Sequence, residues 1–569
     1  MSGITALCDL GGGKLPEGDL AALGLREVSA GFSGQAVDQT LQSLACSAIL
    51  PNRQTFLLGW PAGSELSRVD TNDLANPADT MRALLDRHGA ALSEKVDGEW
   101  LLLDWQPGRL ILVQSRVRRD WLFYARRGDR IVVSGDLERI AELDWIGREI
   151  DPLGFAAAFG RSPLRTAASR RTVVPGVCRL EPGEMLVLTP GGDQSFRAAL
   201  PAVESWRGSF DDAVEAAREL LHRILTDRLA VAGKPGLLLS GGLDSSTLAA
   251  LVSHVAGGGS GLTAFTSVAP QHGDLIDERA EAAAVADRLN LNHAPVVPDL
   301  TTSVYRPEID AYAVAGGPTL SPRHYLYRAL CAAARDRGVA TLFDGAAGEY
   351  TLTSYAPLLG PRYRLRQMAK RLLGRGGDPT LGSLYHARLA PHRAAQLDPE
   401  ASELARQHHL PLAERRPGEA WGWMPGFRKI WEPPTLLNLG LRGEVPYRDP
   451  RLLALFAGFP AQFLVHDGLN RAPARAMMAG QLPEAIRLRR TTGAFSPDYM
   501  TRIRSQAPAA LERLSVFRKA GAEDWIDLVW LEQALQQVGA RGPQSISEAF
   551  EVQLTAMAAE FLVWWRGVG

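Results

Sequence analysis

The stretch of the sequence with the clearest chemistry is LLLSGGLDSSTLAALV, which spans residues 237–252. Its pattern predicts a buried strand, a turn of two glycines, and a helix that begins near Ser246. Gly241 and Gly242 let backbone N–H groups approach an anion without a Cβ in the way, and the helix N-terminus adds free donors with partial positive charge. The serines add hydroxyl donors. The pattern therefore predicts a phosphate loop with contacts from Ser240, Gly241, Gly242, Asp244, Ser245 and Ser246.

Asp244 is the residue of this loop that phosphate binding alone does not explain, because its carboxylate adds negative charge beside phosphates. It fits a site in which Mg²⁺ lies between carboxylate and phosphate oxygens, since a hard cation prefers both. The loop is not of the Walker A type, because it lacks the GxxxxGK[ST] pattern and its lysine. The alternative interpretation is a Gly-Gly turn in which Asp and Ser cap the helix.

Strands and helices alternate around this loop, which favours a parallel, doubly wound sheet. The expected strands are residues 235–240, 262–269 and 339–345, and the chain from there to residue 569 is expected to be mostly helical. A helix is expected after Ser209 and Asp212, which have the form of a capping box.

The first 200 residues have a different pattern, with short apolar runs separated by Gly, Pro or Asp turns. The runs are residues 99–105, 109–115, 121–127 and 129–135. Such runs predict an all-β or α+β domain. We therefore expect two domains, residues 1–200 and residues 205–569.

The charge balance limits the partners of the chain. Lys and Arg total 62 against 63 Asp and Glu, for a formal net charge of −1, which excludes binding to nucleic acid through bulk positive charge. The four cysteines are scattered without a CxxC pair, which is typical of reduced thiols. No signal-peptide pattern is present, and no uncharged apolar run approaches the ~20 residues that span a bilayer. We expect a cytoplasmic protein without nucleic-acid or membrane partners.

Taken together, the motifs resemble the asparagine synthetase family, in which a glutaminase-like domain precedes an ATP-dependent synthetase domain. The first loop resembles the pyrophosphate loop of the ATP-pyrophosphatase superfamily. Further regions also match the family. LTAFTSV resembles the strand that frames adenine in the family, and FDGAAGEY (343–350) resembles a second phosphate and metal motif. Two C-terminal signatures are matched by EVPYRDPRLLALFAGFP (444–460) and RAPARAMMAGQLPEAIRLRR (471–490). The resemblance implies an α+β N-terminal glutaminase-like (Ntn-type) sandwich domain plus an α/β ATP-pyrophosphatase synthetase domain with a parallel sheet and a helical C-terminal part.

The resemblance also implies the ligands ATP and Mg²⁺ and assigns residues to them. Ser267 lies on the adenine strand, and Asp344 and Gly345 lie in the second motif, so these three are candidate nucleotide contacts. Where the family usually has an aspartate at the end of this motif, the chain has Glu349, which can ligate Mg²⁺ together with Asp244. The alternative is that Asp344 and Glu349 are loop carboxylates without a ligand.

The N-terminal half departs from the family where a glutaminase needs its chemistry. A working glutaminase of the family has a cysteine nucleophile at position 2, and this chain has Ser2. The Asn-Gly-Glu turn of the glutamine pocket is replaced by Leu58-Gly59-Trp60, and Cys8 fits a core position better than a nucleophile. We therefore expect the N-terminal domain to be a scaffold and not a source of ammonia.

A second departure removes the lysine that, in the family, stabilises charge while the acyl-adenylate is attacked. Its position falls on Thr491, and no lysine lies between Lys429 and Lys519. Arg489 or Arg490 is the candidate catalytic replacement, because a guanidinium binds a phosphate or an oxyanion through two hydrogen bonds. The alternative is that the two arginines form a solvated helix end.

A family member without a glutaminase takes its amine from another source. The branch that the sequence most resembles is the lasso peptide cyclase, an AMP-forming carbon–nitrogen ligase. Such an enzyme adenylates an Asp or Glu side chain of a precursor peptide, and the N-terminal amine of the peptide displaces AMP to close a macrolactam. The resemblance implies two partners, the precursor peptide and the leader peptidase or leader-binding protein of the same pathway. Two alternatives stay open: a small-molecule amide ligase that uses ammonia or a free amine, and a nucleotide-binding scaffold without chemistry.

Two further features have alternative interpretations. Trp421, Trp423, Phe427 and Trp431 form either a groove for an apolar peptide or an aromatic core cluster. The basic stretch at residues 362–375 either receives an acidic partner or is a solvated face.

Overall fold

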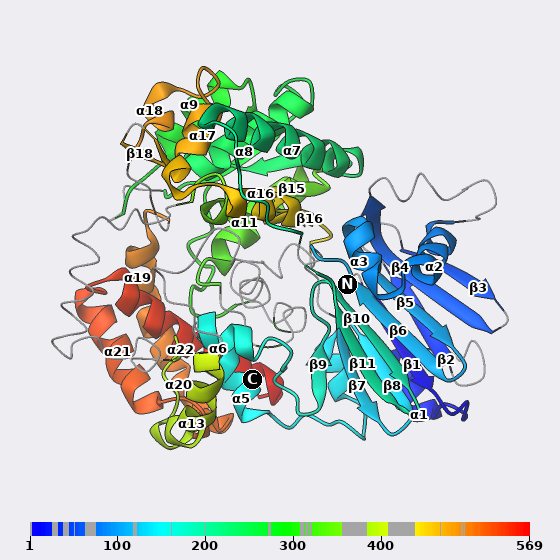
Figure 1. The fold of residues 1–569 in the computed structure, drawn as a ribbon. Coiled ribbons are helices and arrows are strands. Elements are labelled where there is room, and N and C mark those ends of the chain that lie inside the picture. Colours follow the sequence, from blue (N-terminus) through cyan, green and yellow to red (C-terminus); the bar gives the residue numbers. More distant parts are fainter. Residues whose placement is uncertain are drawn as a thin grey trace, which may run out of the picture. The chain divides into compact units, whose positions relative to one another are not determined.

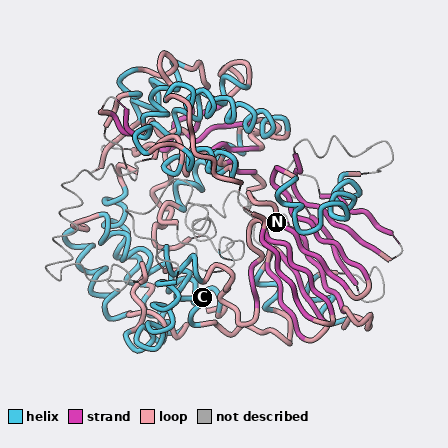
Figure 2. The backbone as a smooth tube through the Cα atoms, viewed as in Figure 1, coloured by secondary structure: helices cyan, strands magenta, loops and turns pink. Residues whose placement is uncertain are grey.

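The structure is a computed structural model, shown in Figures 1 and 2. It describes residues 3–25, 32–37, 45–50, 52–62, 76–117, 122–160, 162–199, 201–270, 275–307, 312, 317, 321–354, 384–407, 439–466, 468–490, 493 and 496–568. The chain divides into two units, the first with Met1–Phe155, Ser169–Pro201 and Ile309–Gly317, the second with Ala156–Ala168, Ala202–Glu308 and Pro318–Gly569. Residues 156–168 thus belong with the second unit, and the domain boundaries predicted at residues 200 and 205 stay a prediction.

The first unit contains two antiparallel sheets. One has the order β2-β1-β8-β7-β9, from β1 (Gly3–Asp9), β2 (Phe32–Val37), β7 (Phe123–Arg127), β8 (Arg130–Ser134) and β9 (Val177–Arg179). The other has the order β11-β10-β6-β5-β4-β3, from β3 (Ala45–Leu50), β4 (Arg53–Ala62), β5 (Asp97–Gln106), β6 (Arg109–Gln114), β10 (Glu184–Thr189) and β11 (Gly192–Arg197). The four strands predicted between residues 99 and 135 are present as β5 to β8.

The two sheets pack face to face through alternate apolar side chains. Cys8 and Ile131 from the five-stranded sheet lie in one buried cluster with Leu103 and Leu112 from the six-stranded sheet. The other face of the six-stranded sheet is covered by α2 (Pro77–His88), which begins after the capping residue Asn76. This arrangement agrees with the expected α+β sandwich. Cys8 is 1% exposed, which confirms the predicted core position of this cysteine, and this burial raises the pKa of its thiol.

The second unit is built on a five-stranded sheet of order β14-β13-β12-β15-β16. Its strands are β12 (Pro235–Leu238), β13 (Thr263–Ser267), β14 (Asn292–Val296), β15 (Thr341–Phe343) and β16 (Arg442–Glu444). All four pairings are parallel, so the predicted parallel sheet is confirmed. Because β12 lies between β13 and β15, the loops that follow these three strands meet at one edge of the sheet.

Helices cover both faces of this sheet, since successive residues of a strand point to opposite sides. Leu237 and Leu239 pack in one cluster with α7 (Phe210–Ala230), α8 (Leu243–Val255) and α9 (Arg279–Arg288). Leu238 and Phe265 pack on the other side with α11 (His324–Asp336).

The predicted capping box begins α7. The Ser209 hydroxyl accepts the Asp212 N–H at 3.1 Å, and Asp212 Oδ2 accepts the Ser209 N–H at 2.9 Å. Each residue thus satisfies a backbone donor of the other, which fixes where the helix starts.

The C-terminal part of the second unit is helical, as predicted. Its main helices are α19 (Tyr499–Glu512), α20 (Leu514–Lys519), α21 (Leu528–Arg541) and α22 (Ile546–Trp565). Glu560 of the buried helix α22 is only 5% exposed and accepts hydrogen bonds from Arg513 at 2.7 and 2.8 Å, so its charge is paired. Within the part of the chain that the structure describes, no helix is both long and apolar enough to cross a membrane.

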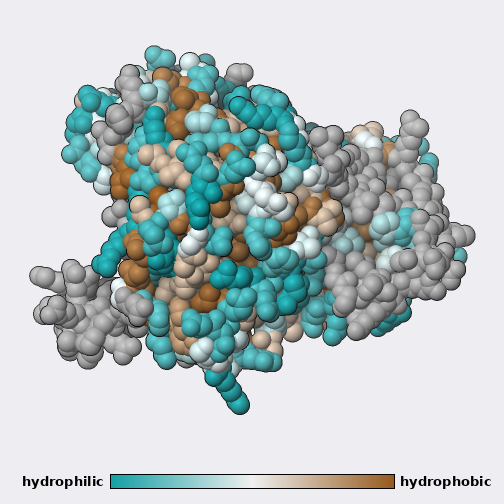
Figure 3. All heavy atoms as spheres, turned by 90° about the horizontal axis from the view of Figure 1, so that it is seen from above, coloured by the Kyte–Doolittle hydropathy of each residue, from teal (hydrophilic) through white to brown (hydrophobic). Residues whose placement is uncertain are grey.

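The surface in Figure 3 mixes hydrophilic residues with small hydrophobic patches. Among the described residues, the large hydrophobic side chains that are exposed are Phe196, Val203, Ile276, Val297, Leu300, Leu488 and Val529. Of these, only Ile276 lines the cavity at the edge of the parallel sheet.

Candidate active site

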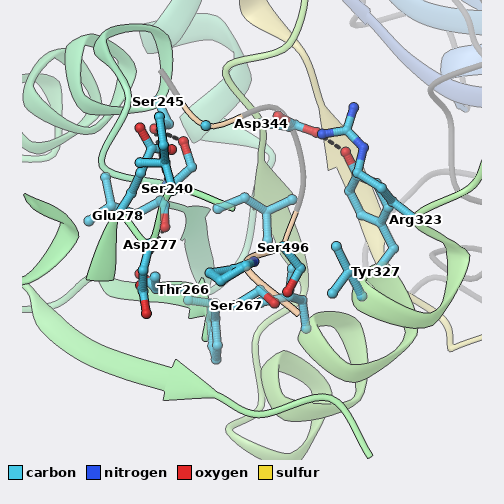
Figure 4. Close-up of a pocket in the computed structure, with 18 residues that line it drawn as sticks. Ser240, Ser245, Thr266, Ser267, Asp277, Glu278, Arg323, Tyr327, Asp344 and Ser496 are labelled. Atoms are coloured by element: carbon cyan, nitrogen blue, oxygen red, sulfur yellow. Dashed lines mark hydrogen bonds between the residues drawn. The ribbon is translucent and has the colours of Figure 1, made fainter. Parts of the chain in front are cut away.

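The loops that follow β12, β13 and β15 line a cavity of about 210 Å³ at the carboxyl edge of the parallel sheet (Figure 4). Its apolar walls come from Leu238, Leu239, Phe265, Ile276, Leu326, Leu330 and Pro497. Its polar groups come from Ser240, Ser245, Thr266, Ser267, Asp277, Glu278, Arg323, Tyr327, Asp344 and Ser496. A cavity with apolar walls and a few convergent polar groups suits an aromatic base with a polar attachment.

The phosphate loop has a defined internal geometry. The Ser240 N–H donates to Ser245 Oγ at 3.1 Å, and the two serine hydroxyl oxygens lie 2.9 Å apart. Gly241 has φ +80°, and a Cβ at this position would lie 2.8 Å from the backbone nitrogen of Ala282 and from the backbone oxygen of Glu278. Only glycine fits here, because the turn needs both a left-handed conformation and close packing against the start of α9.

The predicted nucleotide contacts divide into two groups. Ser240, Ser245, Ser267 and Asp344 line the cavity. Ser246 is fully buried in the first turn of α8 and does not line it. Among the predicted serine contacts within the described part of the chain, the buried hydroxyls of Ser246 and Ser267 have no hydrogen-bond partner. Of these two residues, only Ser267 lines the cavity, so its hydroxyl is available to a ligand there.

Gly345 joins the second motif to the first. A Cβ at Gly345 would lie 2.9 Å from the backbone nitrogen of Ser245, so the glycine allows the loop after β15 to lie directly against the first turn of α8. Asp344 precedes it; its Oδ1 accepts the Ala346 N–H at 3.0 Å, and its Oδ2 accepts the Tyr327 hydroxyl at 3.4 Å. In Figure 4, Asp344 lies with Tyr327 and Arg323 on one side of the cavity, where its carboxylate can accept a ribose hydroxyl.

The two predicted metal ligands also come close to each other. Glu349 lies in the 3-10 turn Gly348–Tyr350, and Asp244 lies in the first turn of α8. The pKa of Glu349 is raised to about 7, first by burial of its carboxyl group and then by the charges of Asp244 and Asp344, although the residue as a whole is exposed. Burial also raises the pKa of Asp244, against the opposing effects of Thr353 and Arg471.

This donor set fits Mg²⁺ bound together with a nucleotide. Mg²⁺ is usually bound by one or two carboxylates plus substrate phosphates, and Asp244 belongs to the phosphate loop while its charge acts on Glu349. A divalent cation would also relieve the repulsion from Asp244 and Asp344, which adds to the effect of burial on the pKa of Glu349. In the described part of the chain, no cluster of three or more His, Cys, Asp or Glu side chains could bind a metal by itself. A cation at this site would therefore depend on the phosphates of the nucleotide.

Three residues that hold Asp244 were not found from the sequence. The Thr353 hydroxyl donates to Asp244 Oδ1, and the Tyr447 hydroxyl donates to the Asp244 backbone oxygen at 3.1 Å. Arg471 Nη1 lies 3.8 Å from Asp244 Oδ2. Tyr447 and Arg471 fall within the two C-terminal signatures, so the motif matches contain them, but nothing in those motifs indicates a contact with Asp244.

Arg471 is a cation close to the predicted metal ligand Asp244. Its side chain is 6% exposed, and the charges of Asp244, Glu349 and Glu278 all act on it. Burial lowers the pKa of its guanidinium and these carboxylates oppose the shift, so the group stays charged. Its backbone is left-handed with φ +57°, an uncommon conformation for a residue with a side chain.

The two arginines predicted to replace the family lysine differ from each other in their contacts and exposure. Arg489 forms ion pairs with Glu278 at 2.8 Å and with Glu281 at 3.4 Å, and Glu278 itself lines the cavity. Arg490 is exposed. Their catalytic role stays a prediction, and Arg489 would have to exchange partners in order to bind a phosphate.

Several features named from the sequence lie outside the described residues. They are Ser2, Thr491, the basic stretch at 362–375 and the aromatic residues Trp421, Trp423, Phe427 and Trp431. The segment Leu58-Gly59-Trp60 is described and forms part of β4, which pairs with β5 through all three residues. Leu58 and Trp60 are 1% and 5% exposed, so this segment is a buried strand.

Gly348→Ala is expected to disrupt the site although it adds only one methyl group. A Cβ at position 348 would overlap Asp244 Oδ1 and lie 2.7 Å from Thr353 Oγ1, so Asp244 must move. Because a misplacement of about 1 Å can cost about a hundredfold in rate, we expect ATP-dependent AMP formation to fall by about that factor. Gly261→Ala is the matched control, since a Cβ there has no atom within 4 Å. Equal activity of the two variants would contradict the assignment of this turn to the site.

Comparison with known proteins agrees with this arrangement. A model of the Asparagine synthase family matches residues 216–566. The chain is 26% identical over 162 residues to Asparagine synthetase (glutamine-hydrolyzing) 3 of Bacillus subtilis (strain 168), a match that covers 28% of this chain and 26% of that protein. It is 25% identical over 227 residues to Amidase chry2 of Gibberella zeae, a match that covers 37% of this chain and 33% of that protein. The matches thus span about a quarter and a third of the lengths of these relatives.

Two solved structures are also similar to the chain. One is the glutamine phosphoribosylpyrophosphate amidotransferase from B. subtilis complexed with ADP and GMP, at 13% identity and a TM-score of 0.22, with 60% of this chain and 75% of that chain covered. The other is the allosteric regulatory enzyme of purine biosynthesis, at 12% identity and a TM-score of 0.22, with 66% and 73% covered.

Proposed function

We propose that this chain, which belongs to the Asparagine synthase family of ATP-dependent amide ligases, is an AMP-forming lasso peptide cyclase. In the first step, an Asp or Glu side-chain carboxylate of a precursor peptide attacks the α-phosphate of ATP, and pyrophosphate leaves. In the second step, the N-terminal amine of the same peptide attacks the acyl-adenylate, AMP leaves with the bonding electron pair, and the amine gives up a proton. The product is a macrolactam that is lighter than the peptide by one water.

The observation that carries this proposal is the buried strand at Leu58-Gly59-Trp60. These residues pair with β5 in the sheet interior, where a glutamine-using member of the family would need an open turn. Cys8 is also buried in the sandwich core and kept protonated. Neither feature provides ammonia from glutamine. The amine of the amide bond then comes from a source other than glutamine, and a peptide that carries both the amine and the carboxylate meets this requirement.

The residues of the second unit support the adenylation step. Ser267 and the apolar wall at Phe265 suit the adenine, and the Asp344 carboxylate suits a ribose hydroxyl.

The phosphate loop at Ser240–Gly242 provides N–H and hydroxyl donors for the phosphates. Mg²⁺ bound by Asp244 and Glu349 would neutralise part of the triphosphate charge. Arg471 adds a fixed positive charge beside these carboxylates, where the leaving pyrophosphate gains negative charge.

The amide-forming step needs little proton chemistry from the protein. An α-amino group has a pKa of roughly 7.7–8.0, so a useful fraction is unprotonated near neutral pH. Holding the peptide so that amine and acyl-adenylate are adjacent makes the attack intramolecular, which can lower the barrier by roughly 7–11 kcal/mol. This is why the reaction can proceed with an arginine and without the family lysine. The precursor peptide and the leader peptidase or leader-binding protein of the pathway are the partners that this function requires.

Incubation with ATP, Mg²⁺ and a candidate precursor peptide tests the function. We expect one AMP per cyclised peptide and a product lighter by one water in the mass spectrum. An N-acetylated peptide should form no macrolactam because its amine is blocked, and peptides with each Asp or Glu changed to its amide identify the acceptor. AMP formation with ammonia and free aspartate, but no peptide product, would contradict the cyclase and favour a small-molecule amide ligase.

A further inference from the structure

The carboxylate of Asp244 is held by a residue outside every motif that the sequence indicates. The Thr353 hydroxyl donates to Asp244 Oδ1, and the Thr353 side chain is fully buried. The backbone of Thr353 is itself fixed, because its N–H donates to the Gly348 oxygen at 3.0 Å. The backbone that carries this donor is therefore tied to the turn after β15.

The contacts around Asp244 leave its two oxygens in different surroundings. Oδ1 is in contact with Thr353, and Gly348 approaches it so closely that no Cβ fits between them. Oδ2 lies 3.8 Å from Arg471 Nη1, and the charge of Glu349 acts on the same guanidinium. The backbone oxygen of Asp244 is held separately by Tyr447. The Thr353 hydroxyl thus determines the orientation of the carboxylate, while Oδ2 faces the Arg471 guanidinium.

We infer that Thr353 is a positioning residue for metal binding: its hydroxyl occupies Asp244 Oδ1 and thereby presents Oδ2 to the cation. The inference rests on the proposed function, since it requires a metal–nucleotide complex at this site. A hydrogen-bonded partner fixes the orientation of a ligating carboxylate before the ion arrives, and loss of such a partner typically lowers metal affinity by about 10- to 100-fold. Thr353 contacts neither the reacting atoms nor, by this scheme, the ion.

The neighbouring Thr351 provides a matched control. It is also fully buried and lies in the same turn, but its hydroxyl donates to the Gly348 backbone oxygen at 3.4 Å and not to Asp244. Thr351→Val and Thr353→Val thus remove the same group from the same segment. Thr353→Ser keeps the hydroxyl and removes only a methyl group.

Binding of Mn²⁺ in the presence of α,β-methylene-ATP, followed by electron paramagnetic resonance, tests the inference without turnover. We expect Thr353→Val to weaken Mn²⁺ binding by about 10- to 100-fold, while Thr353→Ser and Thr351→Val stay within about threefold of the unmodified protein. In AMP formation, Thr353→Val should raise the Mg²⁺ concentration needed for half-maximal rate by a similar factor. The rate at saturating Mg²⁺ should change much less.

The outcomes distinguish failure of the Thr353 role from failure of the proposed metal–nucleotide site. Unchanged Mn²⁺ affinity in Thr353→Val would overturn the role of Thr353 and leave the proposed function intact. If the unmodified protein binds no Mn²⁺ with the nucleotide analogue, the metal site fails and the positioning role fails with it. If Thr353→Val does not fold, Thr353→Ala is compared with Thr353→Ser. Recovery of affinity with the serine supports the inference, and equal affinities of alanine and serine overturn it.

Discussion

Replacing Asp244 with asparagine is expected to reduce ATP-dependent AMP formation by about a thousandfold, the equivalent of roughly 4 kcal/mol in the activation barrier. The change keeps the shape of the side chain and an oxygen for the Thr353 hydroxyl, but it removes the negative charge that a cation requires. We expect this large effect because Asp244 lies where the first turn of α8 contacts the turn after β15. The measurement is release of AMP and pyrophosphate at saturating ATP and Mg²⁺.

A second aspartate at a helix start gives the control for this prediction. Asp211 lies in the first turn of α7, is exposed, and is not part of the capping pair. Asp211→Asn should leave AMP formation within about twofold, since an exposed charge in a first helical turn is worth only about 0.3–1 kcal/mol to the helix. If Asp244→Asn retains more than a tenth of the activity at unchanged thermal stability, the metal assignment is wrong.

The phosphate loop could be predicted from the sequence because all its determinants are local. The strand, the two glycines and the helix start follow one another within residues 237–252, and the parallel pairing of β12 follows from the strand–helix alternation. Gly241 shows why the pattern is informative, since its turn admits no side chain. The strands of the first unit could be predicted equally well, because alternate burial in a sandwich leaves a regular apolar pattern in the sequence.

The residues that hold Asp244 could not be predicted in the same way. Thr353, Tyr447 and Arg471 lie more than a hundred residues from Asp244 in the chain, and a threonine hydroxyl or a tyrosine in a buried turn has no distinctive sequence pattern. Arg489 illustrates the opposite problem. Its position in the chain suggested a phosphate contact, but the sequence does not show that α9 places Glu278 and Glu281 beside it.

Arg471 and Arg489 offer alternative positions for the catalytic cation, and their substitution distinguishes them. We expect Arg471→Ala to lower AMP formation by about a hundred- to a thousandfold, because a fixed donor that meets developing charge contributes that much. Arg489→Ala should cost less than about tenfold, since its charge is paired with the carboxylates of α9. The reverse order of effects would identify Arg489 as the group that replaces the family lysine.

The left-handed backbone of Arg471 allows loss of charge to be separated from loss of structure. Glycine adopts φ +57° without the penalty that a side chain incurs, so Arg471→Gly relieves backbone strain of roughly 1–3 kcal/mol while it removes the guanidinium. If Arg471 acts on the reaction, Arg471→Gly should be at least as stable to heat as Arg471→Ala and equally inactive. If the residue only supports the fold, the glycine variant should regain activity along with stability. A protein that keeps a strained arginine beside a predicted metal ligand, where glycine would be easier to accommodate, is expected to need its charge there.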